Sequence, residues 1–225
     1  EVLLSPEEKR SNLFPIRHRS IWEHYRTALA CFWVPGEVDL SSDVDDWKKL
    51  TDDERFFLSR VLAFFASADG IVNDNLCERF GLEVQVREAK FFYDLQKTME
   101  NLHSEMYSLL IDTLVQDPAE KDVLFHAVER IPCVGKKAQW AQKWIESETA
   151  TFAERLIAFA VVEGVFFSGS FCAIFWVKKR GLLPGLCHSN TLIARDEGLH
   201  QQFATFLYRD FLKERLDEAR VHEIV

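Results

Sequence analysis

Two pairs of side chains in this sequence combine a carboxylate and an imidazole at the same short spacing. Glu100 stands three residues before His103, and Glu197 stands three residues before His200. Residues three apart share one face of an α-helix, so each pair presents two metal-binding groups side by side. Because the chain has 7 His, one such pair arises easily by chance, whereas a second copy at the same spacing favours a metal site.

A single carboxylate among apolar residues precedes each pair. Asp69 lies in the apolar segment 62–72, and Glu163 lies in the apolar segment 160–167. A lone buried Asp, or a lone His on a helix, is more often a hydrogen-bonded core residue than a ligand. Here the two carboxylates precede their pairs by similar separations, so the chain contains the same arrangement of two helices twice.

Together these residues form the ligand set typical of a dinuclear site in a four-helix bundle, in which two helices supply single carboxylates and two supply Glu-x-x-His. We therefore predict six metal ligands: Asp69, Glu100, His103, Glu163, Glu197 and His200. Four carboxylates neutralise two divalent cations, and without those cations the buried like charges would repel one another strongly. An oxygen-rich site with one imidazole per metal suits iron or manganese better than a thiolate-seeking metal.

The composition indicates long helices that position these ligands. Hydrophobic residues make up 48% of the 225 residues, with 19 Phe and 6 Trp but only 9 Gly and 6 Pro. Few helix breakers and many large apolar side chains are typical of a compact helical bundle. No stretch alternates between polar and apolar residues, so we predict an all-α fold. One domain over residues 1–225 is expected, with an irregular lead-in at 1–16.

Helical periodicity and capping signals set the expected boundaries. Thr51 with Glu54, and Thr151 with Glu154, form capping boxes, and Asp117 precedes a proline at the first position of another helix. The residues between 38 and 47 are expected to form a polar connector, and Trp33 is expected to end the first helix. The predicted helices are 21–33, 51–79, 86–115, 118–129, 136–146, 151–179 and 184–218.

Several classes of protein are disfavoured by charge and cysteine content. The net charge of −9, without a basic stripe, argues against nucleic-acid binding. The 5 Cys include no Cys-x-x-Cys and are expected to be reduced thiols in a cytoplasmic protein, and no signal peptide is seen at the N-terminus. The apolar segment 156–177 is long enough to span a bilayer, but Glu163 within it favours a buried core helix and no membrane association.

Three segments, 99–108, 162–171 and 189–200, closely resemble the small, radical-generating subunit of class I ribonucleotide reductase. The resemblance extends from Trp33 to the end of the chain and is stronger to the eukaryotic-type branch than to the bacterial ones. It implies a ferritin-like four-helix-bundle core with additional helices, and the same six metal ligands. It also implies two iron ions, with manganese less favoured, whose oxygen-activated centre oxidises Tyr107 to a stable tyrosyl radical.

The resemblance implies roles for five further side chains. Phe167, Phe171 and Ile193 correspond to residues that line the radical pocket, although each is equally compatible with ordinary core packing. Trp33 and Asp196 correspond to an electron-transfer path, hydrogen-bonded to His103, that leads from the cofactor toward the surface. An aspartate that accepts from the free N–H of a ligand histidine is the expected support for such a ligand. Judged by composition alone, Trp33 would more often be a core residue.

The family relation also implies partners. A large subunit would use the stored oxidising equivalent to reduce ribonucleoside diphosphates to deoxyribonucleotides, and the small subunit would form a homodimer. No docking tail is seen beyond Val225, so this chain is expected to assemble the cofactor but to couple poorly to the large subunit. The alternatives are a ferritin-like ferroxidase, a di-iron monooxygenase or desaturase, or a metal-free helical bundle, and the surroundings of Tyr107 and Trp33 distinguish them.

Overall fold

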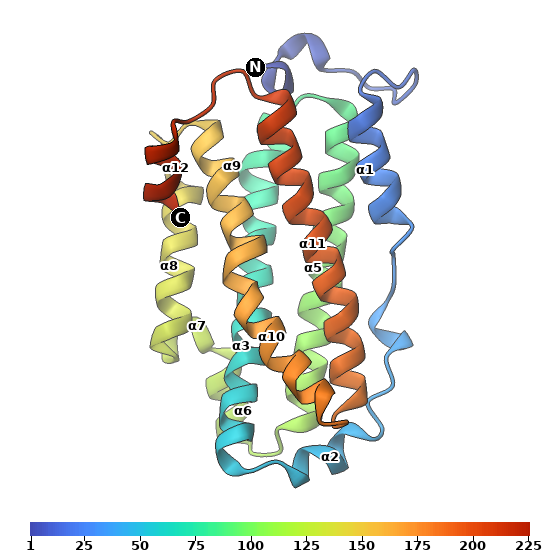
Figure 1. The fold of residues 1–225 in the computed structure, drawn as a ribbon, viewed down its shortest axis with the longest axis vertical. Coiled ribbons are helices and arrows are strands. Elements are labelled where there is room, and N and C mark those ends of the chain that lie inside the picture. The colour runs from blue at the N-terminus through green and yellow to red at the C-terminus, as the bar shows by residue number, and fades with distance from the viewer.

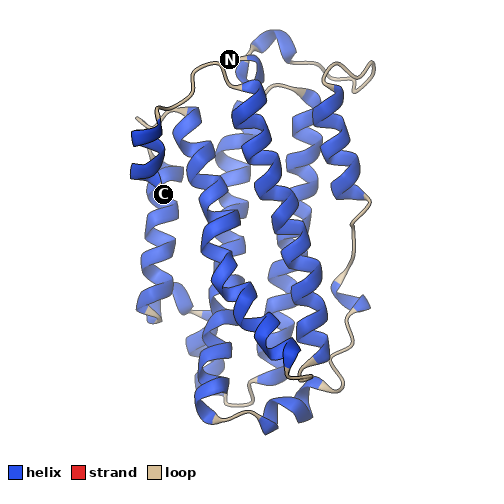
Figure 2. Cartoon of the chain, in the orientation of Figure 1, coloured by secondary structure: helices blue, strands red, loops and turns tan.

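The computed structural model describes residues 1–225, and every regular element in it is a helix (Figures 1 and 2). The α-helices are α1 Arg19–Leu29, α2 Asp43–Lys49, α3 Asp52–Asn75, α4 Gly81–Glu83, α5 Arg87–Leu114, α6 Pro118–Phe125, α7 Ala127–Arg130, α8 Pro132–Glu146, α9 Phe152–Val161, α10 Phe167–Lys179, α11 Pro184–Phe211 and α12 Glu218–Ile224. The shorter elements are the 3-10 turns η1 Val2–Leu4, η2 Pro6–Glu8 and η3 Pro35–Glu37, and the π-helical turns η4 Leu76–Phe80 and η5 Val162–Phe166. The all-α prediction is confirmed.

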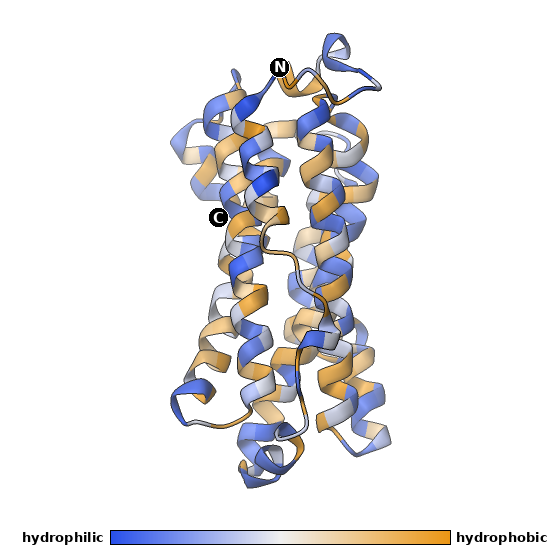
Figure 3. Cartoon of the chain, turned by 90° about the vertical axis from the view of Figure 1, so that its right-hand side faces the viewer, coloured by the Kyte–Doolittle hydropathy of each residue, from blue (hydrophilic) through white to orange (hydrophobic).

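Four long helical rods form the centre of the molecule. Helix α3 packs against α5, and the rod made of α9, η5 and α10 packs against α11 (Figure 1). Helix α1 covers α5 from outside, and α8 packs against α3 and α9. Each helix interleaves hydrophobic and hydrophilic residues along its length (Figure 3), and the buried apolar side chains form one continuous cluster of 51 residues. This arrangement buries the inner face of every rod.

The three helix starts predicted from capping signals agree with the structure. Thr51 accepts from the backbone N–H of Glu54 while the Glu54 carboxylate accepts from the N–H of Thr51, and Thr151 and Glu154 repeat this reciprocal pair. Asp117 likewise accepts from the N–H of Ala119 at the start of α6. These local hydrogen bonds satisfy backbone donors that have no partner inside a helix, which is why short sequence signals locate them.

The first part of the chain differs from the prediction. Helix α1 ends at Leu29, not at Trp33. Pro35 restricts the residue before it to extended backbone, and Val34 is extended, so the chain leaves the helix before Trp33. The expected connector over 38–47 also contains α2, whose buried Asp43 accepts from two backbone N–H groups in the first turn of α11.

Three later boundaries were also wrong. Helix α8 begins at Pro132, four residues before the predicted start at 136, because proline at a first helical position sacrifices no hydrogen bond. A break at His126 divides the helix predicted over 118–129 into α6 and α7. The last long helix ends at Phe211, and a separate α12 begins at Glu218.

Gly81 illustrates why a glycine does not always end a helix. Its backbone is right-handed helical (φ −63°), and helical structure continues to Glu83. Gly181 has φ 67°, in the left-handed region that favours glycine, and follows the end of α10 as predicted. The conformation, rather than the residue type alone, decides where the helix stops.

Two rods are long and apolar enough to cross a bilayer, Asp52–Glu83 and Phe152–Lys179. About half of the apolar window in each is buried against other helices of the bundle, 56% and 50% respectively. Each rod also contains a buried carboxylate, Asp69 in the first and Glu163 in the second. These features match the predicted core helices.

Candidate metal centre

The six predicted ligands meet at the middle of the bundle. They come from all four rods: Asp69 from α3, Glu100 and His103 from α5, Glu163 from η5, and Glu197 and His200 from α11. None of the six is more than 2% exposed. The bundle therefore brings together four carboxylates and two imidazoles that are separated by up to more than half of the chain.

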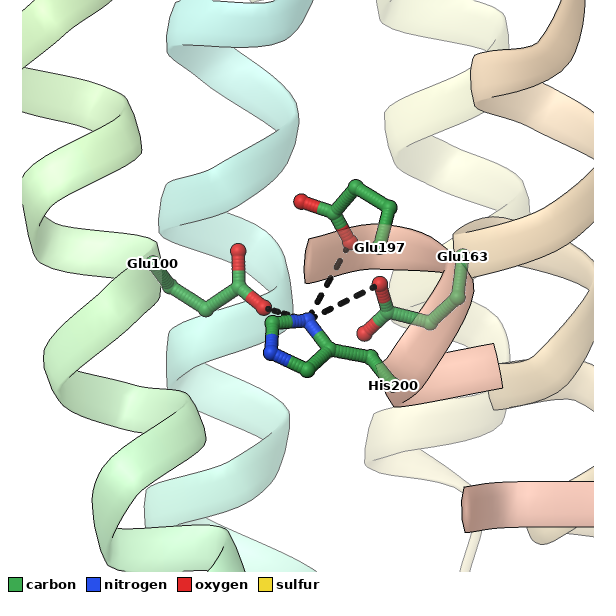
Figure 4. Close-up of side chains that lie close together, drawn as sticks. All are labelled: Glu100, Glu163, Glu197 and His200. Atoms are coloured by element: carbon green, nitrogen blue, oxygen red, sulfur yellow. Dashed lines mark hydrogen bonds and ion pairs between the residues drawn. The ribbon is translucent and has the colours of Figure 1, made fainter. Parts of the chain in front are cut away.

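One group of ligands surrounds His200. Its Nδ1 lies 3.0 Å from Glu100 Oε1, 3.3 Å from Glu197 Oε2 and 3.9 Å from Glu163 Oε2. Figure 4 shows the three carboxylates converging on this nitrogen from different helices. The ligand atoms of the four residues all lie within 4.8 Å of one another, close enough to bind one ion.

A second group surrounds His103. Its Nδ1 lies 3.0 Å from Glu197 Oε1 and 3.5 Å from Glu100 Oε2, and Asp69 joins Glu100 and His103 within 4.8 Å. Glu100 and Glu197 therefore each reach both histidines, while Asp69 and Glu163 lie at opposite ends. This geometry is that of two adjacent ion positions that share two central carboxylates.

Glu163 lies in a π-helical turn, not in a regular α-helix. The turn η5 interrupts the rod over Val162–Phe166 and changes the direction of the side chains that follow. The next residue, Gly164, allows α11 to approach closely, because a Cβ there would lie 2.9 Å from Cγ of Gln201. Isolated π-turns of this kind are frequent at functional sites.

The buried polar atoms indicate that this centre suits metal ions. Seven atoms of the cluster have no hydrogen-bond partner: both carboxylate oxygens of Asp69 and of Glu100, Glu163 Oε2, Glu197 Oε1 and His103 Nδ1. A buried polar atom without a partner costs several kcal/mol, and a buried unpaired charge costs more. Two divalent cations would supply the missing partners and balance the four carboxylates, so the residues present fit a dinuclear site.

Burial and the charges of neighbouring groups also shift the pKa values of these buried residues. Burial, followed by repulsion from neighbouring glutamates, raises the pKa of Asp69 and of Glu163 well above their ordinary values. Burial opposes protonation of His200, but the nearby Glu100 and Glu197 outweigh it and raise its pKa to about 9. The cluster without metal therefore retains protons on several groups that would bind an ion.

Tyr107 lies beside this cluster in a dry pocket. It is 1% exposed, and its hydroxyl has no hydrogen-bond partner. Burial, followed by the negative charge of Asp69, raises the pKa of this phenol well above its ordinary value. Its ring stacks on Phe65, with centroids 4.7 Å apart and planes inclined by 3°. The phenol is thus held neutral and away from water.

Two of the three predicted pocket residues contact the Phe65 ring of this stack, and the third lies near the cluster. Phe167 and Phe171 contact Phe65, with ring centroids 5.5 and 4.7 Å apart. Ile193 is fully buried one helical turn before Glu197. Phe65, which makes the direct ring contact with Tyr107, was not predicted, although it lies one turn before Asp69 on the same face of α3.

Trp33 is connected to the cluster by hydrogen bonds. Its indole Nε1–H donates to Asp196 Oδ2 over 2.7 Å, and the same oxygen lies 3.2 Å from His103 Nε2. The rings of Trp33 and His103 stack with centroids 6.1 Å apart. The other Asp196 oxygen accepts from the Arg195 guanidinium. Trp33, Asp196 and His103 therefore form a continuous buried chain. Arg195, whose side chain is partly exposed, extends this chain to the surface.

Known proteins resemble this chain in both sequence and fold. The family model described as ribonucleotide reductase, small chain, matches residues 10–225. The ribonucleoside-diphosphate reductase small chain of monkeypox virus is 59% identical over 212 residues, which are 94% of this chain and 66% of the viral protein. This chain belongs to the ribonucleotide reductase small-chain family.

Two other members agree in sequence and in fold. Human ribonucleoside-diphosphate reductase subunit M2 is 56% identical over 225 residues, all of this chain and 58% of the human protein. The structure of the ribonucleotide reductase Rnr4 homodimer from Saccharomyces cerevisiae superimposes with a TM-score of 0.90 at 35% identity, covering 100% of this chain and 71% of that one. The predicted eukaryotic-type small subunit is confirmed, and this chain spans about two thirds or less of the monkeypox virus and human proteins.

Two more buried side chains of α5 in this ribonucleotide reductase small chain were not predicted, and of these Gln96 contacts the cluster. Gln96 Nε2–H donates to Glu163 Oε1 over 2.9 Å, and Gln96 is 1% exposed. Tyr93 is equally buried, and its hydroxyl has no partner. The signal for both was their spacing, since they precede Glu100 by four and seven positions and share its face of α5.

Proposed function

We propose that this chain is the metal-binding part of a ribonucleoside-diphosphate reductase small subunit that generates a stable radical on Tyr107. The observation that supports it best is the position of a buried phenol without a hydrogen-bond partner beside the six-ligand cluster. When bound, two iron ions would supply the reduction of dioxygen and hence the power to oxidise a tyrosine. Asp69, Glu100, His103, Glu163, Glu197 and His200 would hold them.

The surrounding side chains would protect and connect the radical. Oxidation of Tyr107 removes one electron and the phenolic proton, and the product survives only where water and reductants are excluded. Phe65, Phe167 and Phe171 form that apolar wall. Trp33 and Asp196 would conduct an electron between His103 and the surface, because an indole ring is oxidisable and the chain of hydrogen bonds is unbroken.

The partners follow from the same proposal. We infer a homodimer in the cytoplasm, acting with a large subunit that reduces ribonucleoside diphosphates to deoxyribonucleotides. Iron is preferred over manganese, although carboxylate oxygens and imidazoles suit both. The assembly of the Saccharomyces cerevisiae relative as a homodimer supports the first of these inferences.

Electron paramagnetic resonance after addition of ferrous iron and oxygen to the metal-free protein tests the proposal. We expect a tyrosyl doublet in the parent and none in Tyr107→Phe, which removes only the hydroxyl. Tyr208→Phe is the matched control, since Tyr208 accepts from the backbone N–H of Leu216 outside the cluster, and it should retain the doublet. Metal uptake and oxygen consumption without any organic radical in the parent would contradict the role of Tyr107.

A further inference from the structure

Helix α8 does not close the bundle completely where it packs against α3 and η5. A cavity of about 20 Å³ remains in this seam, and a second of about 20 Å³ lies next to it. The two share Ile71, Ala141 and Val162 in their walls. We refer to the first, bounded by Phe64, Ala68, Val134, Ala138, Val162 and Phe167 among its 11 lining residues, as the seam cavity.

The seam cavity is apolar. Nine of its 11 lining residues are hydrophobic, and the hydroxyl of Ser67 already donates to the Ala63 carbonyl over 2.9 Å. The volume exceeds the roughly 10–15 Å³ that a water molecule needs, but a buried water also needs two or more polar partners. Cavities with such walls stay dry and accept small apolar guests instead.

The inner wall of the seam cavity adjoins the metal centre. Ala68 and Val162 immediately precede the ligands Asp69 and Glu163. Phe167, also in the wall, contacts Phe65, which stacks on Tyr107. The cavity wall therefore includes the residues next to two terminal ligands, and two stacked or contacting rings, Phe167 and Phe65, lie between the cavity and the phenol.

Lys137 covers the outer end of the seam cavity. Its ammonium lies 4.0 Å from the centroid of the Phe64 ring and 5.8 Å from that of Phe166, and burial lowers its pKa. A lysine over aromatic faces is held by weak cation–π attraction, so rotation of its flexible side chain can displace it. Its charge disfavours the approach of metal ions while a neutral molecule can pass.

We propose that the seam cavity binds dioxygen and delivers it to the metal centre between α3 and η5. Dioxygen is small, neutral and apolar, so it partitions into a dry apolar cavity in preference to water. This inference rests on the proposed function for its oxygen chemistry, whereas binding of an apolar gas to the cavity does not.

Xenon binding and oxidation kinetics, measured on the same variants, test this delivery. Xenon is an inert apolar probe, and its site is located by anomalous diffraction from crystals under xenon pressure. Ala138→Leu fills the cavity from α8, Ala138→Val fills it partly, and Gln139→Leu is the matched control, because Gln139 is exposed on the same helix. We expect xenon in the parent and in Gln139→Leu, reduced occupancy in Ala138→Val and none in Ala138→Leu.

The second measurement is the rate at which the ferrous-loaded protein is oxidised at limiting oxygen concentration. If the filled cavity excludes dioxygen, Ala138→Leu should be oxidised at least about tenfold more slowly than the parent, equivalent to about 1.4 kcal/mol of added barrier. The oxidation rate of Ala138→Val should lie between those of Ala138→Leu and the parent. Ferrous iron content and the thermal midpoint, measured on each variant, show that folding and metal binding are intact. If leucine at position 138 is too large and distorts the packing of α8, the smaller Ala138→Val variant still tests the proposal.

The outcomes separate the two proposals. Absence of xenon from the parent cavity, or an unchanged oxidation rate in a folded variant that excludes xenon, would overturn the delivery route while leaving the radical function intact. Loss of the tyrosyl doublet from the parent, with xenon still bound and oxidation still slowed by Ala138→Leu, would overturn the radical function alone. Xenon binding together with graded slowing supports the inference.

Discussion

The two helix pairs of the bundle carry the same ligand pattern, and a leucine precedes each histidine, but several other residues around the pattern differ. In the first pair, α3 supplies Asp69 and α5 supplies Glu100 and His103; in the second, η5 supplies Glu163 and α11 supplies Glu197 and His200. Four residues after its histidine, the first pair has Tyr107 whereas the second has the buried Ala204. The candidate ligands are thus repeated and the buried tyrosine is not.

The two histidines also differ in their surroundings, because an aspartate lies beside Nε2 of His103 and no ion pair involves Nε2 of His200. Asp196, directly before Glu197, lies 3.2 Å from Nε2 of His103, while the ion pairs of His200 all involve Nδ1. The residue before Glu100 is Met99, which offers no carboxylate. A symmetric set of ligands suffices to bind two similar ions. The proposed radical and electron path need the asymmetric residues, and these gather on the side of His103.

The largest expected effect comes from the central carboxylates. Glu100 reaches both histidines, whereas Glu163 lies at one end of the cluster. We expect Glu100→Ala to abolish binding at both positions and Glu163→Ala to abolish one. Each lost position should bind at least about 100-fold more weakly, since changes outside the ligands alone cost 10–100-fold. Ferrous iron titration followed by elemental analysis measures this, and equal stoichiometry in the two variants would contradict shared ligation by Glu100.

The stability of the metal-free protein should fall as the pH rises. The pKa of His200 is raised from 6.5 to about 9, so its stabilising contribution is complete below about pH 6.5 and is lost as the pH rises through about 9. The expected loss is about 3 kcal/mol. Raised pKa values of Asp69 and Glu163 act in the same direction, because their protonated forms are the ones favoured by folding.

Urea unfolding of the metal-free protein across this pH range measures the slope. His200→Gln should flatten it, whereas His126→Gln, which removes a partly exposed surface imidazole, should leave it unchanged. Metal binding requires deprotonated ligands, so the loaded protein should show the opposite trend. A metal-free protein that becomes more stable from pH 6.5 to 9 would show that the cluster is not protonated as described.

The smallest expected effect concerns Asp196, which contacts His103 in the first helix pair and has no counterpart beside His200 in the second. Asp196→Asn keeps the size of the side chain but removes the charge that orients His103, and such changes weaken metal binding about 10–100-fold. We expect this loss at one of the two positions only, seen as a split in a ferrous iron titration that the parent shows as a single steep step. Arg195→Gln is the control, because Arg195 touches Asp196 but not the histidine. Equal weakening of both positions would show that Asp196 supports the whole cluster.

Much of the site could be predicted because its signals are local. Glu-x-x-His depends only on the pitch of a helix, and a capping box needs only four consecutive residues, so the sequence alone placed Glu100 beside His103 and identified the Thr51 cap. Trp33 was placed on the wrong element although its partner was predicted, because the hydrogen bond to Asp196 joins residues far apart in the chain. The direct stacking of Phe65 on Tyr107 could not be distinguished from ordinary core packing by spacing alone.

The sequence by itself determined the long helices of the bundle, the six candidate ligands and the repeat that relates the two halves, since these depend on periodicity and residue type. The tertiary structure decided that Glu100 and Glu197 are shared by both histidines. It also decided that a π-turn directs Glu163, and that Gln96 and Phe65 complete the surroundings. These features depend on distances between separate helices, and such distances are set only when the apolar faces of all four rods pack together.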